Sequence, residues 1–225
     1  MLKILAVLFS FAILCISIAC SVAENASPVS LPDPQPVAAA TPTTGNTTQT
    51  AVFAGGCFWG VDAVYKHVKG VTDVKSGYAG GSSKTAEYER VSEGDTGHAE
   101  SVRVEFNPQQ VSYEQLLKIF FSVVHDPTEL NRQGPDTGTQ YRSAIFYTTD
   151  DQKKAADSYI AKLTSDKAFS KPIVTQVVPL KGFYEAEDYH QNYLANHLDQ
   201  PYIVINDIPK VENLKKQFPD LYVEK

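Results

Sequence analysis

The sequence predicts an α+β fold, in which helices pack against a mixed β-sheet. Segments with alternating apolar residues, typical of strands, are interleaved with segments whose apolar residues recur at helical spacing. The predicted order is strand, helix, strand, strand, helix, strand, helix, strand, which favours a mixed sheet. About 175 residues follow from Ala51 onward, and a chain of this length can bury one core.

The predicted elements follow the apolar pattern of the chain. The clearest strand carries Val102, Val104 and Phe106 on one face. The next helix begins at Ser112, where Gln115 completes a capping box. In chain order, we expect strands at 49–54, 71–78, 100–106, 141–147 and 173–180, helices at 57–67, from 112, at 150–163 and at 186–197, and a less regular stretch toward residue 225.

A long loop is expected between His125 and Thr139. This segment is dense in Pro, Gly, Asn and Asp. Loops of this length without regular structure are usually functional, because binding and catalytic residues are often carried on loops held by a rigid scaffold. Within it, Asp126-Pro127 is interpreted as a turn former.

The first 20 residues predict an export leader. Lys3 supplies a positive charge, and residues 4–18 are apolar. Two processing sites compete: Ser17-Ile18-Ala19-Cys20 resembles a lipoprotein box, which would place a lipid on Cys20, whereas Ser21-Val22-Ala23 suits ordinary signal peptidase. We expect export to the bacterial periplasm or cell envelope, with an anchor at Cys20.

Composition divides the chain into four parts. Residues 21–50 are rich in Pro, Thr, Ala, Ser and Asn and lack apolar periodicity, so they predict a disordered tether. The expected parts are the leader at 1–20, the tether at 21–50, a globular catalytic domain at 51–210 and a C-terminal tail at 211–225. The net charge is −6 without a basic cluster, which excludes a nucleic-acid partner. We expect a monomer that meets the membrane only through its leader or lipid.

The cysteine count leaves one thiol in the domain. The chain has three cysteines, and Cys15 and Cys20 lie in the leader. In an oxidising compartment, a lone thiol such as Cys57 is a liability unless it is fully buried or useful.

The most informative motif is Gly55-Gly56-Cys57-Phe58-Trp59-Gly60, which contains the only tryptophan. Glycines permit a tight turn from strand to helix. The turn places the Cys57 sulfur at a helix N-terminus, where backbone N–H groups favour the thiolate. Phe58 and Trp59 then form an apolar wall for a small ligand. The alternative is an inert buried thiol, since free cysteine is among the most buried residue types.

A thiolate beside an aromatic box can attack the sulfur of a sulfoxide. The sulfoxide oxygen is a poor leaving group until it is protonated, so the reaction needs an acid that is neutral near pH 7 and hydroxyl donors. Glu100 opens a strand, and burial would raise its pKa. Tyr88 lies in a polar loop, and Asp136 and Tyr141 bracket another. Taken singly, each is more often a surface or core residue.

Several runs together resemble the type A peptide methionine sulfoxide reductases. The resemblance covers roughly residues 50–210, in the order of that family. The matching runs are 55–60, Gly77-Tyr78-Ala79-Gly80-Gly81, Gly94-Asp95-Thr96-Gly97-His98-Ala99-Glu100, His125-Asp126-Pro127-Thr128, Gln133 to Arg142, 183–191 and Tyr193-Leu194.

The resemblance implies a ferredoxin-like α/β plait and a role for each residue of the site. The family acts on the S epimer of methionine sulfoxide, free or in proteins, without a metal or an organic cofactor. Cys57 would be the nucleophile that passes through a sulfenic acid, Glu100 the proton donor, Tyr88 and Tyr141 the hydrogen-bond donors to the oxygen, Asp136 the residue that positions substrate or water, and Phe58 and Trp59 the box that holds the methyl group.

One departure concerns recycling. Many members of the family carry resolving cysteines near the C-terminus, whereas this chain has no cysteine after Cys57. We therefore expect an outside thiol, thioredoxin-like or small, to reduce the sulfenic acid.

Two other functions remain open on sequence grounds. A cysteine-centred hydrolase or peroxidase is the enzyme alternative, although a hydrolase would require a Cys–His pair. A lipoprotein module that binds oxidised methionine without converting it is the non-enzyme alternative. His98, His190 and His197 are interpreted as structural, because the spacing of the last two does not suit zinc on a helix.

Overall fold

The structure is a computed structural model that describes residues 31–35 and 48–225. The predicted leader, with Cys15 and Cys20, lies outside the described residues, so its processing stays a prediction. Among the described residues, no helix is both long and apolar enough to cross a membrane.

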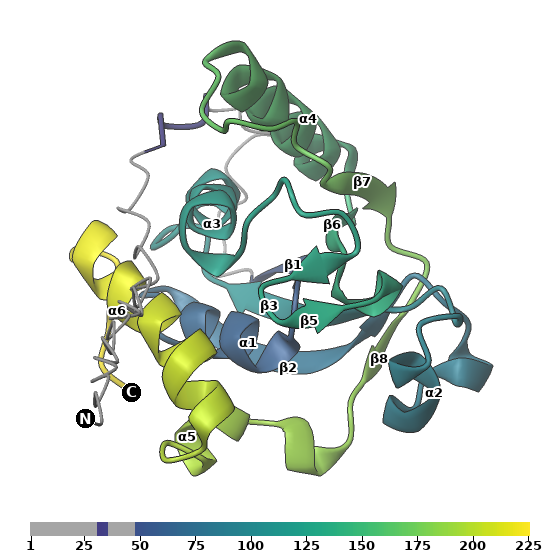
Figure 1. The fold of residues 1–225 in the computed structure, drawn as a ribbon. Helices are drawn as coiled ribbons and strands as arrows, with labels where there is room; N and C mark the ends of the chain where they lie inside the picture. Colours follow the sequence, from purple (N-terminus) through teal and green to yellow (C-terminus); the bar gives the residue numbers. More distant parts are fainter. Residues whose placement is uncertain (1–30, 36–47) are drawn as a thin grey trace, which may run out of the picture.

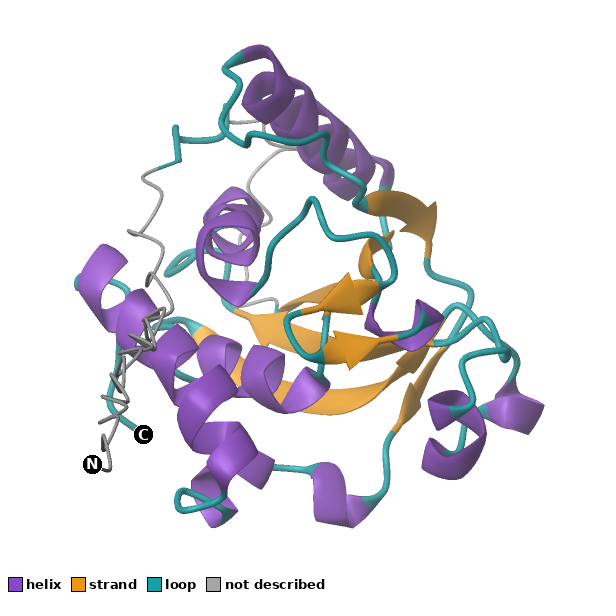
Figure 2. Ribbon diagram, viewed as in Figure 1, coloured by secondary structure: helices purple, strands orange, loops and turns teal. Residues whose placement is uncertain are grey.

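A six-stranded mixed sheet organises the domain, in the order β7-β6-β1-β3-β2-β8 (Figures 1 and 2). Every neighbouring pair is antiparallel except β6 and β7. The strands are β1 (Gln49–Gly55), β2 (Val71–Ala79), β3 (Ala99–Phe106), β6 (Ser143–Tyr147), β7 (Gln176–Pro179) and β8 (Phe183–Glu185), and a separate hairpin joins β4 (Arg132–Gln133) to β5 (Asp136–Thr137).

The helices cross between strands or cover the sheet. They are α1 (Phe58–Lys66), α2 (Tyr88–Ser92), α3 (Tyr113–Ile119), α4 (Asp150–Ser165), α5 (Tyr193–Asn196) and α6 (Ile208–Gln217), with two π-helical turns, η2 (Phe120–Val124) and η5 (Ile203–Asp207), and three short 3₁₀ turns, η1 (Ser83–Thr85), η3 (Thr139–Tyr141) and η4 (Asp188–His190).

The four central strands form the expected plait. The α1 crossover joins β1 to β2, and β3 is inserted between them. The crossover through α3 joins β3 to β6 in the same way, with β1 between those two strands. Two interleaved βαβ units of this kind make a ferredoxin-like sheet, so the predicted α+β fold is confirmed.

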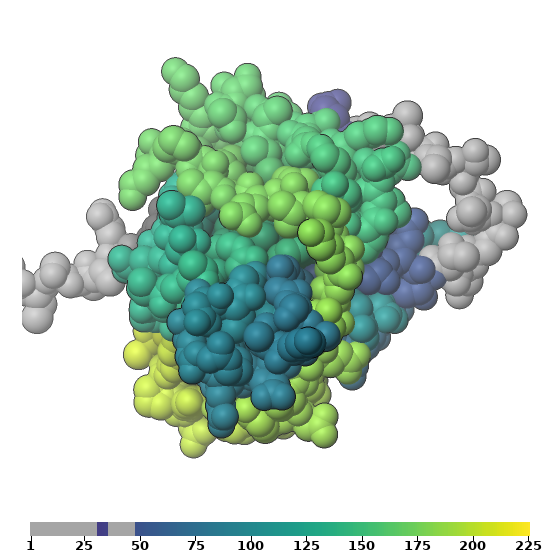
Figure 3. Space-filling model, turned by 90° about the vertical axis from the view of Figure 1, so that its right-hand side faces the viewer, coloured from purple at the N-terminus to yellow at the C-terminus, as the bar shows by residue number. Residues whose placement is uncertain are grey.

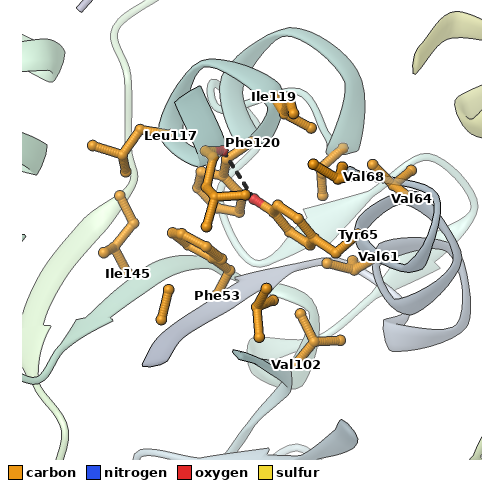
Figure 4. Close-up of a cluster of buried hydrophobic side chains, with 14 of the residues drawn as sticks. Phe53, Val61, Val64, Tyr65, Val68, Val102, Leu117, Ile119, Phe120 and Ile145 are labelled. Carbon is orange, nitrogen blue, oxygen red and sulfur yellow. Dashed lines mark hydrogen bonds between the residues drawn. The ribbon is translucent and has the colours of Figure 1, made fainter. Parts of the chain in front are cut away.

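The main core lies between the sheet and α1, α3 and η2. Phe53 of β1 stacks on Tyr65 of α1 at 5.2 Å and on Phe120 of η2 at 5.1 Å between ring centroids, as Figure 4 shows. The Tyr65 hydroxyl donates to the carbonyl of Leu116 at 3.1 Å, which satisfies its only buried polar group. The capping box of Ser112 and Gln115 is present, as predicted.

The predicted helix at 186–197 is wrong. The segment instead follows directly after β8 and contains only the short turn η4 and the one-turn helix α5. The Gln191 side chain bonds the backbone N–H and carbonyl of Ser76 on β2, and Asn192 has φ +55°, which interrupts helical geometry. Polar contacts with β2 therefore override the aromatic helical pattern.

The C-terminal stretch is more regular than predicted. Helix α6 runs through the expected boundary at residue 210, with Pro209 in its first turn. Val211 and Leu214 are buried, and α6 packs on α1. Three- and four-residue apolar spacing after a proline is a helix signal that was present in the sequence.

Part of the predicted disordered tether packs on the domain. Leu31 is buried with only 3% of its surface exposed. The Tyr159 hydroxyl donates to the Pro32 carbonyl at 2.9 Å, and Lys118 pairs with Asp33 at 2.6 Å. The prediction of disorder is therefore wrong for residues 31–35, because a single apolar side chain has found a core position between α3 and α4.

Candidate active site

The turn from β1 to α1 presents Cys57. β1 ends at Gly55, and Cys57 occupies the position before the first helical residue, Phe58. Gly56 has φ +91°, a conformation that favours glycine, and a Cβ there would lie 2.7 Å from Gln133. The glycines of the motif therefore allow both the turn and the close approach of the 125–139 loop.

Glu100 lies against this turn because of the strand register. Phe53 of β1 faces Val102 of β3, so the same register carried two residues further brings Glu100 opposite Gly55. The backbone N–H of Phe58 donates to Glu100 Oε2 at 3.0 Å. Phe58 directly follows Cys57, and the Cys57 thiol lowers the pKa of this carboxyl group, so nucleophile and acid are neighbours.

Burial makes Glu100 a weak acid. Only 3% of the residue is exposed. Desolvation is the main cause that raises the pKa of Glu100 to about 8, against the opposing hydrogen bond from Phe58 and with a smaller contribution from the Asp136 charge. The carboxyl group is therefore protonated at pH 7, which is the condition that a proton donor requires.

The predicted thiolate is not the resting form of Cys57. Burial raises the pKa of the Cys57 thiol well above its ordinary value, and the charges of Glu100 and Asp207 raise it further. The backbone N–H of Trp59 and the Lys210 ammonium act in the opposite direction but are smaller. The helix N-terminus does favour the thiolate, as predicted, but desolvation outweighs it and the resting group is a thiol.

Tyr88 and Tyr141 flank the pair from two different loops. Tyr88 begins α2, and Tyr141 ends η3. Burial raises the pKa of both phenols, and the charge of Glu100 raises both further. Electrostatic coupling of both tyrosines to Cys57 and Glu100 means that the four predicted residues converge on one site.

Arg142 ties the Tyr141 loop to the start of β3. Its guanidinium group donates to the carbonyls of Gly97, His98 and Thr139, each at 2.9 Å. This fork holds η3 against the residues that lead into Glu100.

Asp136 lies in the hairpin strand β5, within electrostatic reach of Glu100. Tyr202, which sequence reasoning missed, donates its hydroxyl to Asp136 Oδ2. The Tyr202 ring also meets Trp59 edge-on at 5.9 Å between centroids. One tyrosine from the C-terminal region thus joins the loop carboxylate to the aromatic box.

The two predicted box residues lie at different depths. Phe58 is fully buried against Tyr78 and His190. Trp59 is partly exposed, stacks on Tyr193 at 3.7 Å between centroids and donates its Nε1–H to His190 Nδ1 at 3.1 Å. Phe58 therefore lies at the base of the aromatic box, and Trp59 forms its partly exposed side.

Glu187, in the segment that follows β8, supports Tyr88. Its Oε1 accepts from the Tyr88 N–H at 2.9 Å, and its Oε2 accepts from the Tyr78 hydroxyl at 2.8 Å. Figure 3 shows the segment around α2 lying beside the segment that carries β8. The two segments together form the outer rim of the site.

Asp207 and Lys210 are further residues that sequence reasoning missed. Asp207 is fully buried at the end of η5, and its Oδ1 lies 3.2 Å from Lys210 Nζ. A Cβ at Gly60 would overlap the Asp207 carboxylate, so the last glycine of the motif is required for this approach. Gly60 was the only indication of this contact in the sequence, and it did not show which residue would approach it.

The three histidines that were interpreted as structural each hydrogen-bond another protein group. His98 accepts from the Gly81 N–H and contacts the Ser82 carbonyl, which agrees with its structural interpretation. Within the described ranges, no group of three or more His, Cys, Asp or Glu is arranged to hold a metal ion. A cavity of about 290 Å³ on another side of α1, lined in part by Asp62, contains none of the predicted site residues.

Comparisons with known proteins agree with this architecture. A family model described as peptide methionine sulfoxide reductase matches residues 49–222. Peptide methionine sulfoxide reductase MsrA 2 of Mesorhizobium japonicum is 56% identical over 178 residues, which cover 79% of this chain and 91% of that protein. The protein of the same name from Synechocystis is 51% identical and covers 86% of this chain and 92% of that protein.

Solved structures give the same result. Mxr1 of Saccharomyces cerevisiae in reduced form is similar with a TM-score of 0.64 and 36% identity, covering 68% of this chain and 87% of that one. Methionine sulfoxide reductase A of Corynebacterium diphtheriae has a TM-score of 0.60 and 35% identity, covering 76% and 85%. This chain therefore belongs to the type A peptide methionine sulfoxide reductases, a family of oxidoreductases.

Proposed function

We propose that this protein reduces methionine S-sulfoxide, free or within proteins, to methionine. The single observation that carries the proposal is the position of the buried Glu100, which accepts from the backbone N–H next to Cys57 and stays protonated near pH 7. Membership of the family supports the same substrate class.

In the proposed first step, the Cys57 sulfur attacks the sulfoxide sulfur. The departing oxygen takes up the proton of the thiol and the proton of Glu100, while Tyr88 and Tyr141 donate hydrogen bonds to it. The sulfoxide S–O bond breaks as a bond forms between the two sulfurs, and the oxygen leaves as water. A water molecule then adds to the Cys57 sulfur and breaks the bond between the sulfurs, which releases the sulfide, returns one proton to Glu100 and leaves a sulfenic acid on Cys57. Methionine sulfur is reduced and the cysteine is oxidised by two electrons.

Recycling is proposed to be intermolecular. A thiol of a thioredoxin-like protein or a small molecule attacks the sulfenic acid, forms a mixed disulfide and releases water, and a second thiol then releases Cys57. Support comes from the cysteine count, since the sequence has no cysteine after Cys57. A sulfenic-acid probe added after one equivalent of substrate should label Cys57, and a fully reduced thiol would contradict the scheme.

The decisive experiment uses dithiothreitol and the separate S and R epimers of an aryl methyl sulfoxide. We expect sulfide from the S epimer, little from the R epimer and none from the Cys57→Ser variant. Binding without product would favour the module that only recognises oxidised methionine. Product from Cys57→Ser would remove the nucleophile from the mechanism.

We also propose that the protein repairs envelope proteins while anchored through a lipid on Cys20. The leader pattern of the first 20 residues supports this location. Mass spectrometry of the mature N-terminus tests it: an acylated Cys20 is the expected result, and a free N-terminus near Glu24 would instead indicate ordinary cleavage.

A further inference from the structure

A second buried carboxyl group lies beside the nucleophile's helix and has no task in the proposed sulfoxide chemistry. Asp207 is fully buried, and its Oδ1 pairs with Lys210. Its Oδ2 is also buried, without a hydrogen-bond partner among the described residues. A buried ionisable group of this kind is costly, so its place in the site calls for a physical role.

The pair lies against the first turn of α1. A Cβ at Gly60 would overlap the Asp207 carboxylate and lie 2.8 Å from Lys210 Nζ. Gly60 is three residues after Cys57, on the order of 5 Å along the helix axis. A fully buried carboxyl group and a partly exposed ammonium group therefore lie close to the sulfur, where Coulomb interactions are stronger than between fully exposed groups.

We propose that Asp207 and Lys210 are positioning residues that set how readily Cys57 loses its proton, with Asp207 favouring the thiol and Lys210 favouring the thiolate. Neither residue needs to touch the substrate. Burial and the Glu100 charge have the largest effects on the pKa of Cys57. Beyond these two, the Asp207 charge raises this pKa and the Lys210 charge lowers it, as expected from their positions beside α1.

Other groups face the sulfur from the surrounding elements and stay unchanged in the test. They are Glu100 from β3, Tyr88 from α2, Tyr141 from η3 and Tyr202 just before η5, with Asp136 of β5 next to Glu100 and a neutral His125 near Lys210. All of these groups are present in every variant. Opposite shifts in the pH dependence of Cys57 alkylation can therefore be assigned to Asp207 and Lys210.

The pair has a consequence for selectivity. A thiol reacts with general oxidants and alkylating reagents far more slowly than a thiolate. By favouring the thiol, Asp207 would limit loss of the resting Cys57 to such reagents. This consequence rests on the proposed role of Cys57 as nucleophile, whereas the ionisation itself is measurable without any sulfoxide.

The test is the rate of Cys57 alkylation by iodoacetamide from pH 7 to 11, followed on the Cys57 peptide by mass spectrometry in the full chain. Asp207→Asn should move the midpoint to lower pH, and Lys210→Met should move it to higher pH. A shift of one pH unit changes the rate below the midpoint about tenfold, so at pH 8 we expect a severalfold increase in the first variant and a severalfold decrease in the second.

Lys216→Met is the matched control, because it removes the same charge from an exposed position of α6. It should leave the midpoint in place, and the double variant Asp207→Asn, Lys210→Met should return it toward the wild-type value. Shifts in the same direction, or no shift in variants with wild-type circular dichroism, would overturn the proposal. If Asp207→Asn does not fold, a rate in Lys210→Met that is equal to or above wild type overturns it alone. Failure of sulfide formation in a protein whose alkylation follows these shifts would refute the proposed function only.

Discussion

Cys57 and Glu100 come from the centre of the sheet, whereas Asp136, Tyr202 and Asp207 come from segments that lie against its end. The first pair is fixed by adjacent strands, a single register and one backbone hydrogen bond. The second group is held by side-chain contacts between the β4–β5 hairpin, η5 and α1. The reacting groups are thus placed by backbone geometry, and the groups around them by side-chain contacts.

This difference predicts how the two sides respond to change. A substitution on the sheet side removes a reacting group without moving its neighbours, since the hydrogen bonds between strands hold the backbone in place. A substitution on the loop side alters charge and position together, because one contact often joins two segments.

The largest expected effect is on the sheet side. Glu100→Gln should lower kcat by about 10²–10⁴-fold, because it removes the proton donor and keeps an acceptor for the Phe58 N–H. Cys57 should remain alkylatable. Glu105→Gln, on the same strand, is the control and should retain activity. Full activity in Glu100→Gln would show that another group supplies the proton.

The same variant should change the pH dependence of stability. In the wild type, the pKa of Glu100 rises from its ordinary value of 4.5 to about 8 on folding. The folded state therefore holds an extra proton between these values, and stability falls as pH rises through them. Between pH 4.5 and 8.5, the free energy of unfolding of Glu100→Gln should therefore rise by up to about a few kcal/mol relative to that of the wild type. Urea unfolding at both pH values measures the difference, and parallel curves would contradict the buried acid.

On the loop side, Arg142→Met should have the next largest effect. It removes the donors to three carbonyl groups that join η3 to the start of β3. We expect a loss of about 2–4 kcal/mol in the free energy of unfolding together with a lower kcat/KM. Arg132→Met, which alters an exposed guanidinium in the hairpin, is the control. Unchanged stability in Arg142→Met would mean that η3 is held by other contacts.

The smallest effect should come from Tyr202→Phe. The variant keeps the ring beside Trp59 but loses the hydrogen bond to Asp136. A charged hydrogen bond of this kind is worth about 1.5–3 kcal/mol, so kcat/KM should fall roughly tenfold or somewhat more. Tyr189→Phe, at an exposed ring, should have no effect. A wild-type kcat/KM in Tyr202→Phe would show that the hydrogen bond to Asp136 does not contribute to the reaction.

The sequence predicted the sheet side more completely than the loop side, for a physical reason. Alternation fixes the strand that carries Glu100, and the glycine-rich turn fixes Cys57, so both residues follow from local pattern. The approach of Tyr202 and Asp207 depends on how η5 packs against α1, which no local pattern encodes. The absence of a resting thiolate was also beyond the sequence, because it depends on how completely the folded chain excludes water from the sulfur.

If the proposed lipid anchor is present, the packing of Leu31 on the domain shortens the segment between the enzyme and the bilayer. With Cys20 as the anchored residue, only the eleven residues 21–31 span the gap, instead of the thirty residues 21–50 that the composition suggested. At roughly 3.5 Å per residue, the attachment point can stand no more than about 40 Å from the bilayer surface. Repair would then be confined to a thin zone above the lipid, and clients further away would have to diffuse to it.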